Sequence, residues 1–283
     1  MLEAGDPSGP AVLVHNGTPA SGLLFDGWIE DAERRGIRLL GYDRPGYGHS
    51  SPHRGRTVAD AAPDVSAVAD ALGIERLAVW GSSGGGPHAL ACAALLPDRV
   101  TAVATLGSVA PYPAEGLDWF EGMGELNVTE FHAALEGREV LEPFLAREAE
   151  AMATADAEAI AEALRSLLSP VDHAVITGVL ASYFLASTRR AVSGGVEGWL
   201  DDDLAFTRPW GFDLERIEVP VQLWHGGEDR FVPLAHGEWI AERIPGVDAR
   251  ISSEEGHLTL AVGRVPDVHA WLLEQQSGVR AAR

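Results

Sequence analysis

The sequence contains no lysine: in a chain of 283 residues, all 21 basic residues are arginine. A protein without lysine cannot form a Schiff base between a lysine amine and a carbonyl substrate, and it lacks the lysine of the Walker phosphate-binding loop. The chain also has a single cysteine, Cys92, which excludes an intramolecular disulfide and a zinc site built from cysteines. Because Cys92 lies in the apolar run 88–96, we interpret it as a small buried hydrophobic residue.

Basic residues are also few, and long apolar runs are missing. With 42 acidic residues the formal net charge is -21, and such a surface repels nucleic-acid phosphates and anionic lipids. No segment approaches the roughly 18 uninterrupted apolar residues of a membrane span. Residues 1–6 also lack the basic and apolar regions of a signal peptide. We therefore expect a cytoplasmic protein that binds neither nucleic acid nor a membrane. The sequence leaves open whether two copies of the chain form a homodimer.

Short apolar segments alternate with helix-length segments in the first part of the chain, which is typical of a parallel sheet with crossover helices. The predicted strands are residues 11–15, 37–42, 76–80 and 100–106. The predicted helices are residues 23–35, 57–72 and 84–96, with Thr57 as the cap of the second and Gly36 ending the first.

The alternation stops after residue 107 and resumes near residue 214. In between, the pattern is helical, most clearly at 148–168 and 174–190. Afterwards we predict strands at 221–224 and 249–252, helices at 234–244 and 258–276, and a frayed tail at 277–283. The predicted fold is therefore an α/β core, with a mostly parallel doubly wound sheet flanked by helices, from residues 1–107 and 214–283. Residues 108–213 form an inserted helical cap.

The turn after the third predicted strand carries the strongest functional signal. Residues 80–86 read WGSSGGG and contain the pattern Gly-x-Ser-x-Gly from Gly81 to Gly85. A strand that turns at once into a helix holds its nucleophile in strained dihedrals, and the residues two before and two after it must be small. Ser83 meets this rule, whereas Ser82 would have Trp80 two positions before it. We predict Ser83 as a catalytic nucleophile.

Two backbone amides are candidates for an oxyanion hole. The helix that begins near Gly84 directs its N-terminal amides towards the nucleophile, so the Gly84 N–H is one donor. The loop HNGTP at 15–19 follows the first predicted strand, and Gly17 allows the chain to bend, which makes the Thr18 N–H the second donor. Asn16 or Gly17 would take this place if the register shifted by one, and we interpret His15 as a buttress of the loop.

A serine nucleophile needs a general base and a carboxylate that orients it. Among ten histidines, His257 lies in a Gly-His loop after the last predicted strand, and Asp229 follows the strand before it. The order Ser83, Asp229, His257 matches the chain order in which an α/β-hydrolase carries its triad. Glu228 is a carboxylate that competes with Asp229, and we interpret Glu254 and Glu255 as solvated loop charges. The histidines to which we assign structural roles are His225, His236 and His269.

With these motifs the chain resembles the α/β-hydrolase family over nearly its whole length. The resemblance rests on HNGTP at 15–19, YDRPGYG at 42–48, GSSGGG at 81–86, GGEDRFVP at 226–233 and Gly256-His257. The DRPGYG loop is similar to that of proline iminopeptidases, cofactor-independent haloperoxidases and related esterases. The resemblance implies a cap over the active site and hydrolysis through an acyl-enzyme without metal or organic cofactor.

Two departures from the family pattern stand out. Proline iminopeptidases carry His-Gly-Gly-Pro-Gly where this chain has HNGTP, and only ten residues precede Ala11, so the antiparallel edge of the sheet is expected to be shortened or missing. Relatives that open epoxides or remove halide use an aspartate nucleophile, which Ser83 argues against.

The predicted activity is cleavage of a small-to-medium carboxylic ester through a Ser83–His257–Asp229 triad, so the expected binding partner is a small-molecule acyl substrate. The alternatives are a proline iminopeptidase-like aminopeptidase, a hydrolase of carbon–carbon bonds, and a ligand receptor on a hydrolase scaffold. An aminopeptidase needs a cap carboxylate for the substrate's ammonium group. The candidates are Glu115, Asp118, Glu121 and Glu125. The cap aromatic residues and methionine expected to pack its helices or line an apolar pocket are Trp119, Phe120, Met123, Phe131, Phe144, Tyr183, Phe184, Trp199 and Trp210.

Overall fold

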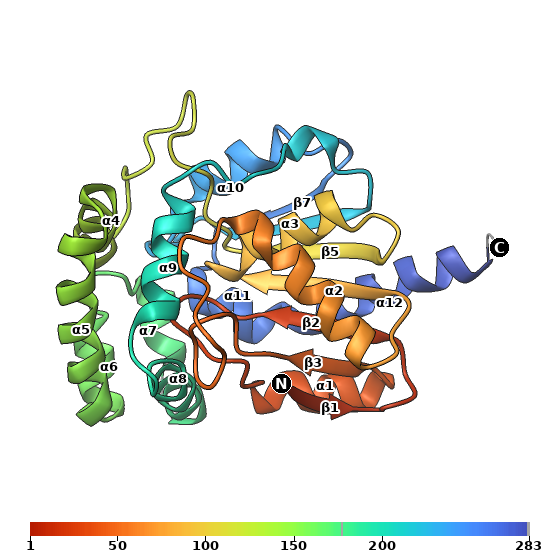
Figure 1. The fold of residues 1–283 in the computed structure, drawn as a ribbon, viewed down its shortest axis with the longest axis horizontal. Helices are drawn as coiled ribbons and strands as arrows, with labels where there is room; N and C mark the ends of the chain where they lie inside the picture. Colours follow the sequence, from red (N-terminus) through yellow and green to blue (C-terminus); the bar gives the residue numbers. More distant parts are fainter. Residues whose placement is uncertain (177, 282–283) are drawn as a thin grey trace.

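A computed structural model describes residues 1–176 and 178–281 and places them in a seven-stranded sheet covered by helices (Figure 1). The strand order is β1-β3-β2-β4-β5-β6-β7; β1 runs antiparallel to β3 and every other neighbouring pair is parallel. This confirms the predicted fold class. The strands are β1 (Leu2–Gly5), β2 (Ala11–His15), β3 (Arg38–Gly41), β4 (Leu77–Ser82), β5 (Val100–Leu106), β6 (Val221–Gly226) and β7 (Asp248–Ser252).

Helices lie on both faces of the sheet and in the segment between β5 and β6. The core helices are α1 (Asp26–Arg35), η1 (Val58–Asp60), α2 (Ala61–Ala71), α3 (Gly85–Leu95), η2 (Leu214–Arg216), α10 (Leu234–Ala241), α11 (His257–Gly263) and α12 (Val265–Ala281). The helices between β5 and β6 are α4 (Glu125–Glu136), α5 (Arg138–Thr154), α6 (Ala157–Ala163), α7 (Pro170–Val175), α8 (Gly178–Ala191) and α9 (Glu197–Phe206).

The central strands are buried on both faces, which explains their continuous apolar sequence. In β2, Val12 and Val14 pack into the cluster formed with α1 and α12, while Ala11 and Leu13 pack into the cluster formed with α2 and α3. The second cluster continues without interruption into the segment between β5 and β6. That segment therefore shares an apolar core with α2 and α3, while Tyr183 of α8 packs against the cluster on the other side of the sheet.

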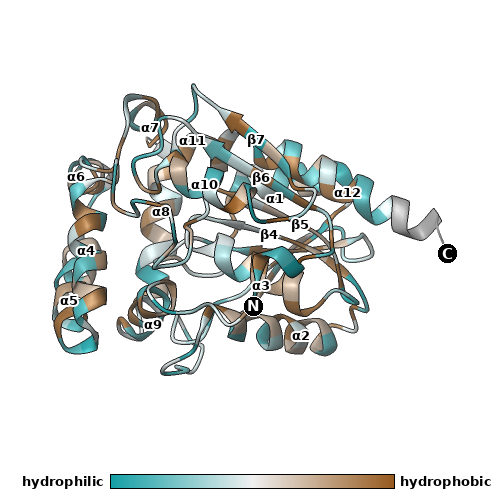
Figure 2. Cartoon of the chain, turned by 90° about the horizontal axis from the view of Figure 1, so that it is seen from above, coloured by the Kyte–Doolittle hydropathy of each residue, from teal (hydrophilic) through white to brown (hydrophobic). Residues whose placement is uncertain are grey.

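The helices between β5 and β6 form two layers beside the carboxyl ends of the parallel strands. Figures 1 and 2 both show α4, α5 and α6 at the outer edge of the molecule, with α8 and α9 between them and the sheet. The carboxyl edge of a parallel sheet is where α/β proteins bind ligands. These helices therefore stand over the edge at which the predicted catalytic residues emerge. The division of the chain into an α/β core and an inserted cap of residues 108–213 stays a prediction.

Three predicted helical stretches are wrong in detail because each is divided in the structure. Segment 148–168 breaks after Thr154, where the carboxylate of Asp156 accepts a hydrogen bond from the Ala159 N–H and starts α6. Segment 258–276 breaks at Arg264 between α11 and α12. Segment 174–190 spans the end of α7 and most of α8, and its residue 177 lies outside the described part of the chain.

Secondary structure extends further towards both ends of the described chain than expected. The edge of the sheet keeps one antiparallel strand, because β1 pairs with β3 from Leu2 opposite Gly41 to Gly5 opposite Arg38. The predicted fraying from Ser277 is also wrong for residues 277–281, since α12 continues to Ala281. The last two predicted tail residues, 282 and 283, lie outside the described residues.

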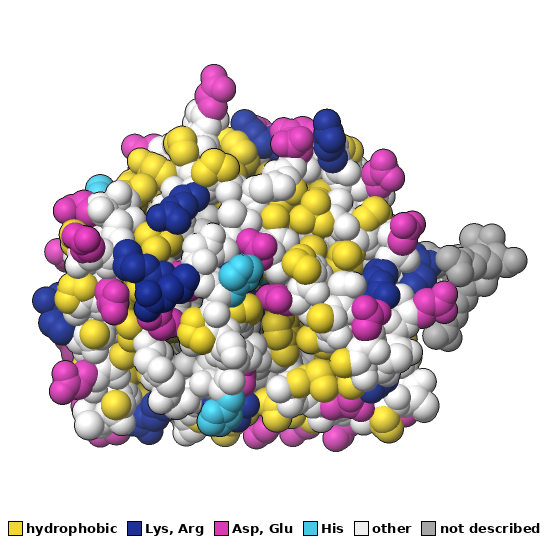
Figure 3. Space-filling model, viewed as in Figure 1, with side chains coloured by type: hydrophobic (Ala, Val, Ile, Leu, Met, Phe, Trp, Pro, Cys, Tyr) yellow, Lys and Arg dark blue, Asp and Glu magenta, His cyan; other side chains and the backbone are white. Residues whose placement is uncertain are grey.

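The surface reflects the excess of acidic residues. On the face seen in Figure 3, acidic side chains are spread over the core and the helices beside it, with arginines among them. Within the described ranges, no helix combines the length and the apolar character needed to cross a membrane.

Candidate active site

Ser83 occupies the sharp turn between β4 and α3. Its φ is 54°, and it is the only non-glycine residue with a positive φ in the described ranges. The Ser83 N–H donates to the carbonyl oxygen of Leu106 at the end of the neighbouring β5 (2.8 Å), which anchors the turn to the sheet. A non-glycine residue held in this region stores strain and is typical of a functional position.

The glycines around Ser83 are required by close contacts. A Cβ on Gly81 would collide with the carbonyl of Gly85, and a Cβ on Gly85 would collide with the carbonyl of His15. A Cβ on Gly17 would lie 3.1 Å from Cβ of Ser83. Gly17 has no positive φ, and its lack of a side chain leaves room for Ser83.

Asp229 and His257 form a buried hydrogen-bonded pair. Oδ2 of Asp229 accepts from Nδ1 of His257 at 2.6 Å, and Oδ1 accepts from the N–H groups of Phe231 and Val232, each at 2.9 Å. Burial lowers the pKa of His257, but the charge and hydrogen bond of Asp229 and the charge of Asp172 outweigh it, so the pKa is raised. Because Nδ1 of His257 carries the hydrogen that is donated to Asp229, Nε2 is the ring nitrogen that can accept a proton.

His257 and Ser83 line one cavity. In the described part of the chain the ring makes its side-chain hydrogen bond to Asp229 and none to Ser83. Such contacts often tighten only when substrate is bound. Glu228, the competing carboxylate, is exposed beside the buried Asp229.

Asp172 on α7 holds the backbone of the His257 loop, a role that sequence reasoning missed. Its Oδ2 accepts from the His257 N–H at 2.9 Å, and its Oδ1 accepts from the N–H groups of Leu258 (2.7 Å) and Thr259 (3.1 Å). These are the first amides of α11, where a carboxylate is favoured by the helix dipole. A segment of the inserted helices thus positions the candidate base.

The two candidate oxyanion donors lie next to each other. A Cβ on Gly84 would be 2.5 Å from Oγ1 of Thr18, and both residues line a cavity with Ser83. Within the described residues, neither the Gly84 N–H nor the Thr18 N–H donates to a protein acceptor. Both amides are therefore available to a ligand.

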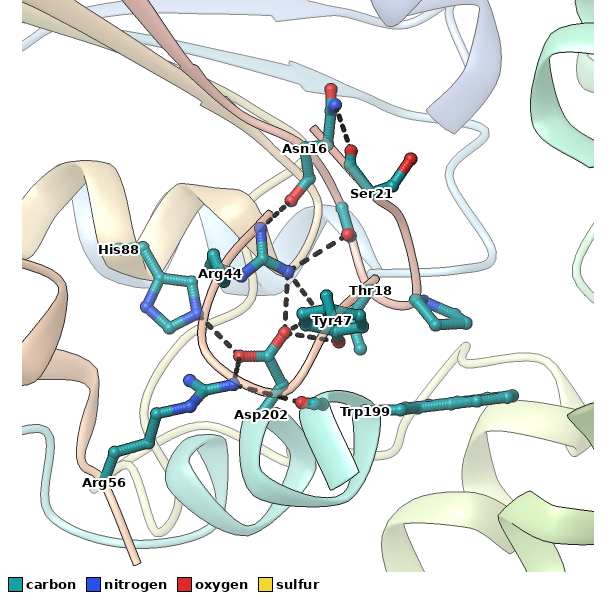
Figure 4. A network of polar contacts seen from close by, with 12 residues as sticks. Asn16, Thr18, Ser21, Arg44, Tyr47, Arg56, His88, Trp199 and Asp202 are labelled. Carbon is teal, nitrogen blue, oxygen red and sulfur yellow. Dashed lines mark hydrogen bonds and ion pairs between the residues drawn. The ribbon is translucent and has the colours of Figure 1, made fainter. Parts of the chain in front are cut away.

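A buried network centred on Asp202 of α9 holds the loop that carries Thr18 (Figure 4). Oδ2 of Asp202 accepts from Oγ1 of Thr18 (2.8 Å) and from Nη2 of Arg44 (2.6 Å), and Arg44 also donates to the carbonyls of Asn16 and Gly17. The remaining contacts of the carboxylate come from Tyr47 (2.7 Å), Arg56 (2.7 Å) and His88 (3.0 Å).

This network is strongly ionic. Burial would raise the pKa of Asp202, but Arg44 and Arg56 outweigh it and hold the pKa well below its ordinary value. Because α9 lies in the inserted segment, the network joins that segment to the candidate oxyanion loop. The sequence offered no signal for it: Asp202 stands in a run of three aspartates, a pattern usually found on solvated faces.

Two cavities adjoin Ser83. Both are lined by Thr18, Pro19, Ser83, Phe184 and Phe231. One, of about 110 Å³, extends to His257 and is otherwise mostly apolar. The other, of about 70 Å³, extends under α4, α5 and α9. Of the predicted cap aromatic residues, those that line the cavities are Phe131, Tyr183, Phe184 and Trp199.

Carboxyl groups also line the second cavity, but they differ from the four cap carboxylates proposed from the sequence to bind a substrate ammonium group. Glu115, Asp118, Glu121 and Glu125 are exposed and line neither cavity. The carboxyl groups that line the second cavity are Glu130, Glu148 and Asp203. In the described ranges no three His, Cys, Asp or Glu side chains are grouped to hold a metal ion.

The other histidines singled out in the sequence contact the scaffold. His225 contacts the carbonyl of Val232 (2.8 Å), and His269 contacts Asp31 (2.9 Å). His236 bridges Ala110 and Trp119, at 3.1 and 2.9 Å. His15 is 1% exposed, and burial lowers its pKa well below the ordinary value. Of the two loop glutamates, Glu254 is exposed and Glu255 pairs with Arg264 at 2.7 Å.

Comparison with known proteins agrees with this architecture. The chain is 31% identical to epoxide hydrolase B of Mycobacterium tuberculosis over 137 residues, which span 47% of this chain and 38% of that enzyme. It is 29% identical to the pimeloyl-[acyl-carrier protein] methyl ester esterase of Chromobacterium violaceum, covering 84% of this chain and 83% of the esterase. Among solved structures, a thermophilic esterase from Thermogutta terrifontis has the same fold, with a TM-score of 0.70, 21% identity and coverage of 97% and 92%.

The aligned part of the epoxide hydrolase is thus well under half of that protein, whereas the two esterases are matched over most of their length. The family profile described as alpha/beta hydrolase fold matches residues 10–263, from the start of β2 to the end of α11. The chain belongs to the alpha/beta hydrolase fold family.

Proposed function

We propose that this protein is a serine hydrolase that cleaves carboxylic esters through an acyl-enzyme formed on Ser83. The observation that carries the proposal is the strained turn that holds Ser83 at a φ of 54° in the cavity that His257 also lines. Nδ1 of His257 donates a hydrogen bond of 2.6 Å to Asp229, which leaves Nε2 of His257 to act as the base.

In the proposed reaction, Nε2 of His257 accepts the proton of Ser83 Oγ as the oxygen attacks the ester carbonyl. The N–H groups of Gly84 and Thr18 donate to the oxyanion, and removal of one such donor typically slows catalysis about 100- to 1000-fold. The protonated His257 then donates to the departing alkoxide. In deacylation neutral His257 takes a proton from water as the water oxygen attacks the acyl carbonyl. His257 then returns this proton to Oγ of Ser83 as the bond between Oγ and the acyl carbon breaks, which releases the acid and restores the free enzyme.

The similarity to a methyl ester esterase over most of both chains supports ester substrates. The side chain at the nucleophile position is a hydroxyl, which supports an acyl-enzyme. The carboxylate nucleophile expected of enzymes that open epoxides is missing from this position. The cavities of about 70 and 110 Å³ beside Ser83 favour small-to-medium acyl groups.

The test compares Ser83→Ala with Ser82→Ala, which removes the neighbouring hydroxyl in the same turn. We expect Ser83→Ala to lose both hydrolysis of p-nitrophenyl esters and labelling by a fluorophosphonate, and Ser82→Ala to keep both. Labelling that persists in Ser83→Ala would contradict the assignment. A single burst of product in the unaltered protein, followed by retention of the ligand, would indicate a receptor in place of an enzyme.

A further inference from the structure

Two buried carboxyl groups face each other in the wall of the second cavity. Glu130 on α4 and Asp203 on α9 both line the cavity that contains Ser83, and their exposed fractions are 8% and 1%. Nε1 of Trp199 donates to Oε1 of Glu130 at 2.7 Å. Neither oxygen of Asp203 meets a hydrogen-bond donor among the described residues.

Burial and the charge of the neighbouring group favour the protonated form of these carboxyl groups. Two carboxyl groups in contact can hydrogen-bond only if one of them is protonated, and burial together with the neighbouring charge favours that state. Burial, followed by the charge of Glu130, raises the pKa of Asp203 well above its ordinary value. Burial, with a smaller contribution from Glu148, raises the pKa of Glu130 to about 7.

Among the described residues, no cation forms an ion pair with Glu130 or Asp203. Arg56, the arginine whose charge acts on Asp203, is bound at 2.7 Å to Asp202 and does not line the cavity. None of the described residues that line the cavity is an arginine or a histidine. The rest of the lining of this cavity is largely apolar. Its apolar side chains include Leu126, Phe131, Met152, Leu164, Leu167 and Phe206.

We propose that Glu130 and Asp203 form a binding site for an ammonium group of the substrate, so that the preferred esters carry a protonated amine on their acyl part. This inference rests on the proposed function, because it extends the same site. The ammonium would donate to the unpartnered oxygens of Asp203 and to Glu130, and the surrounding apolar side chains would enclose the hydrocarbon of the acyl group. Hydrogen bonds to a charged group are among the strongest that proteins make.

The first test measures binding without requiring turnover. Isothermal titration of the Ser83→Ala protein at pH 7 compares L-leucine methyl ester with methyl 4-methylpentanoate, and methyl 6-aminohexanoate with methyl hexanoate. Each pair differs only by the amine, placed near the ester in the first pair and far from it in the second. We expect the amine to tighten binding roughly tenfold or more in at least one pair.

Substitutions in the same Ser83→Ala background assign this preference to the pair. Asp203→Asn and Glu130→Gln are expected to remove it. Glu121→Gln, an exposed cap carboxylate, is the matched control and is expected to keep it. Circular dichroism checks that each variant is folded. Equal binding of both members of both pairs would overturn the inference, and so would a preference that survives both substitutions.

Turnover by the unaltered protein separates this inference from the proposed function. Hydrolysis of the esters without an amine, combined with equal affinities in the binding test, would leave the ester hydrolase standing and refute the ammonium site. Amine-dependent binding that is lost in Asp203→Asn, with no ester hydrolysed, would support the ammonium site and refute the hydrolase.

Discussion

The contact of Asp172 with the His257 loop leads to a prediction that joins stability and catalysis. Asp172→Asn keeps the shape of the side chain but removes its charge and replaces one acceptor oxygen by a donor NH₂. If Oδ1 keeps the amides of Leu258 and Thr259, the new NH₂ faces the N–H of His257, which loses its acceptor. A buried donor left without a partner costs about 1–3 kcal/mol.

We therefore expect the free energy of unfolding of Asp172→Asn to fall by about 1–3 kcal/mol, and its melting temperature by several degrees. The charge of Asp172 also contributes to the raised pKa of His257. A raised pKa stabilises the folded protein below the ordinary value of 6.5, and this stabilisation is lost as the pH rises through the raised pKa. The stability deficit of the variant should accordingly be larger at pH 6 than at pH 9.

The catalytic part of the prediction has a definite sign. His257 must be neutral to act as a base, so removal of a charge that raises its pKa should move the acid limb of kcat/KM to lower pH. The assays are urea unfolding and the pH profile of ester hydrolysis. The matched control is Asp156→Asn, which alters an exposed cap of α6. An unchanged acid limb together with unchanged stability would refute the role assigned to Asp172.

Three further outcomes are expected. Asp229→Asn should lower kcat by about 10⁴-fold, as loss of the orienting carboxylate does in serine proteases, with little change in circular dichroism. Gly81→Ala, whose methyl group would strike the carbonyl of Gly85, should destabilise the protein by about 1–3 kcal/mol in urea titrations, whereas Gly263→Ala, which meets nothing within 4 Å, should stay within about 0.5 kcal/mol. The pKa of Glu130, raised from 4.5 to about 7, makes stability fall as the pH rises through that interval, by at most about 3 kcal/mol. In Glu130→Gln this fall should be smaller; an identical pH dependence of unfolding would contradict the pKa argument.

The core strands and the nucleophile turn could be predicted because their causes are local. Burial on both faces leaves continuous apolar runs such as AVLVH at 11–15, and a strand that turns directly into a helix needs small residues around Ser83. The helix breaks at Asp156 and Arg264 were missed, because an amphipathic pattern continues across a break that one capping side chain or one change of direction creates.

Tertiary structure alone decided which charged residues surround the candidate nucleophile. The sequence shows three adjacent aspartates at 201–203, and nothing in it tells that Asp202 binds Arg44 and Arg56 while Asp203 lines a cavity without a cation. Neither does it place Asp172 at the amides of a helix that begins 85 residues later. A carboxylate's chemistry depends on burial and on partners that are distant in sequence, and only the packing of the inserted helices on the sheet edge brings those partners together.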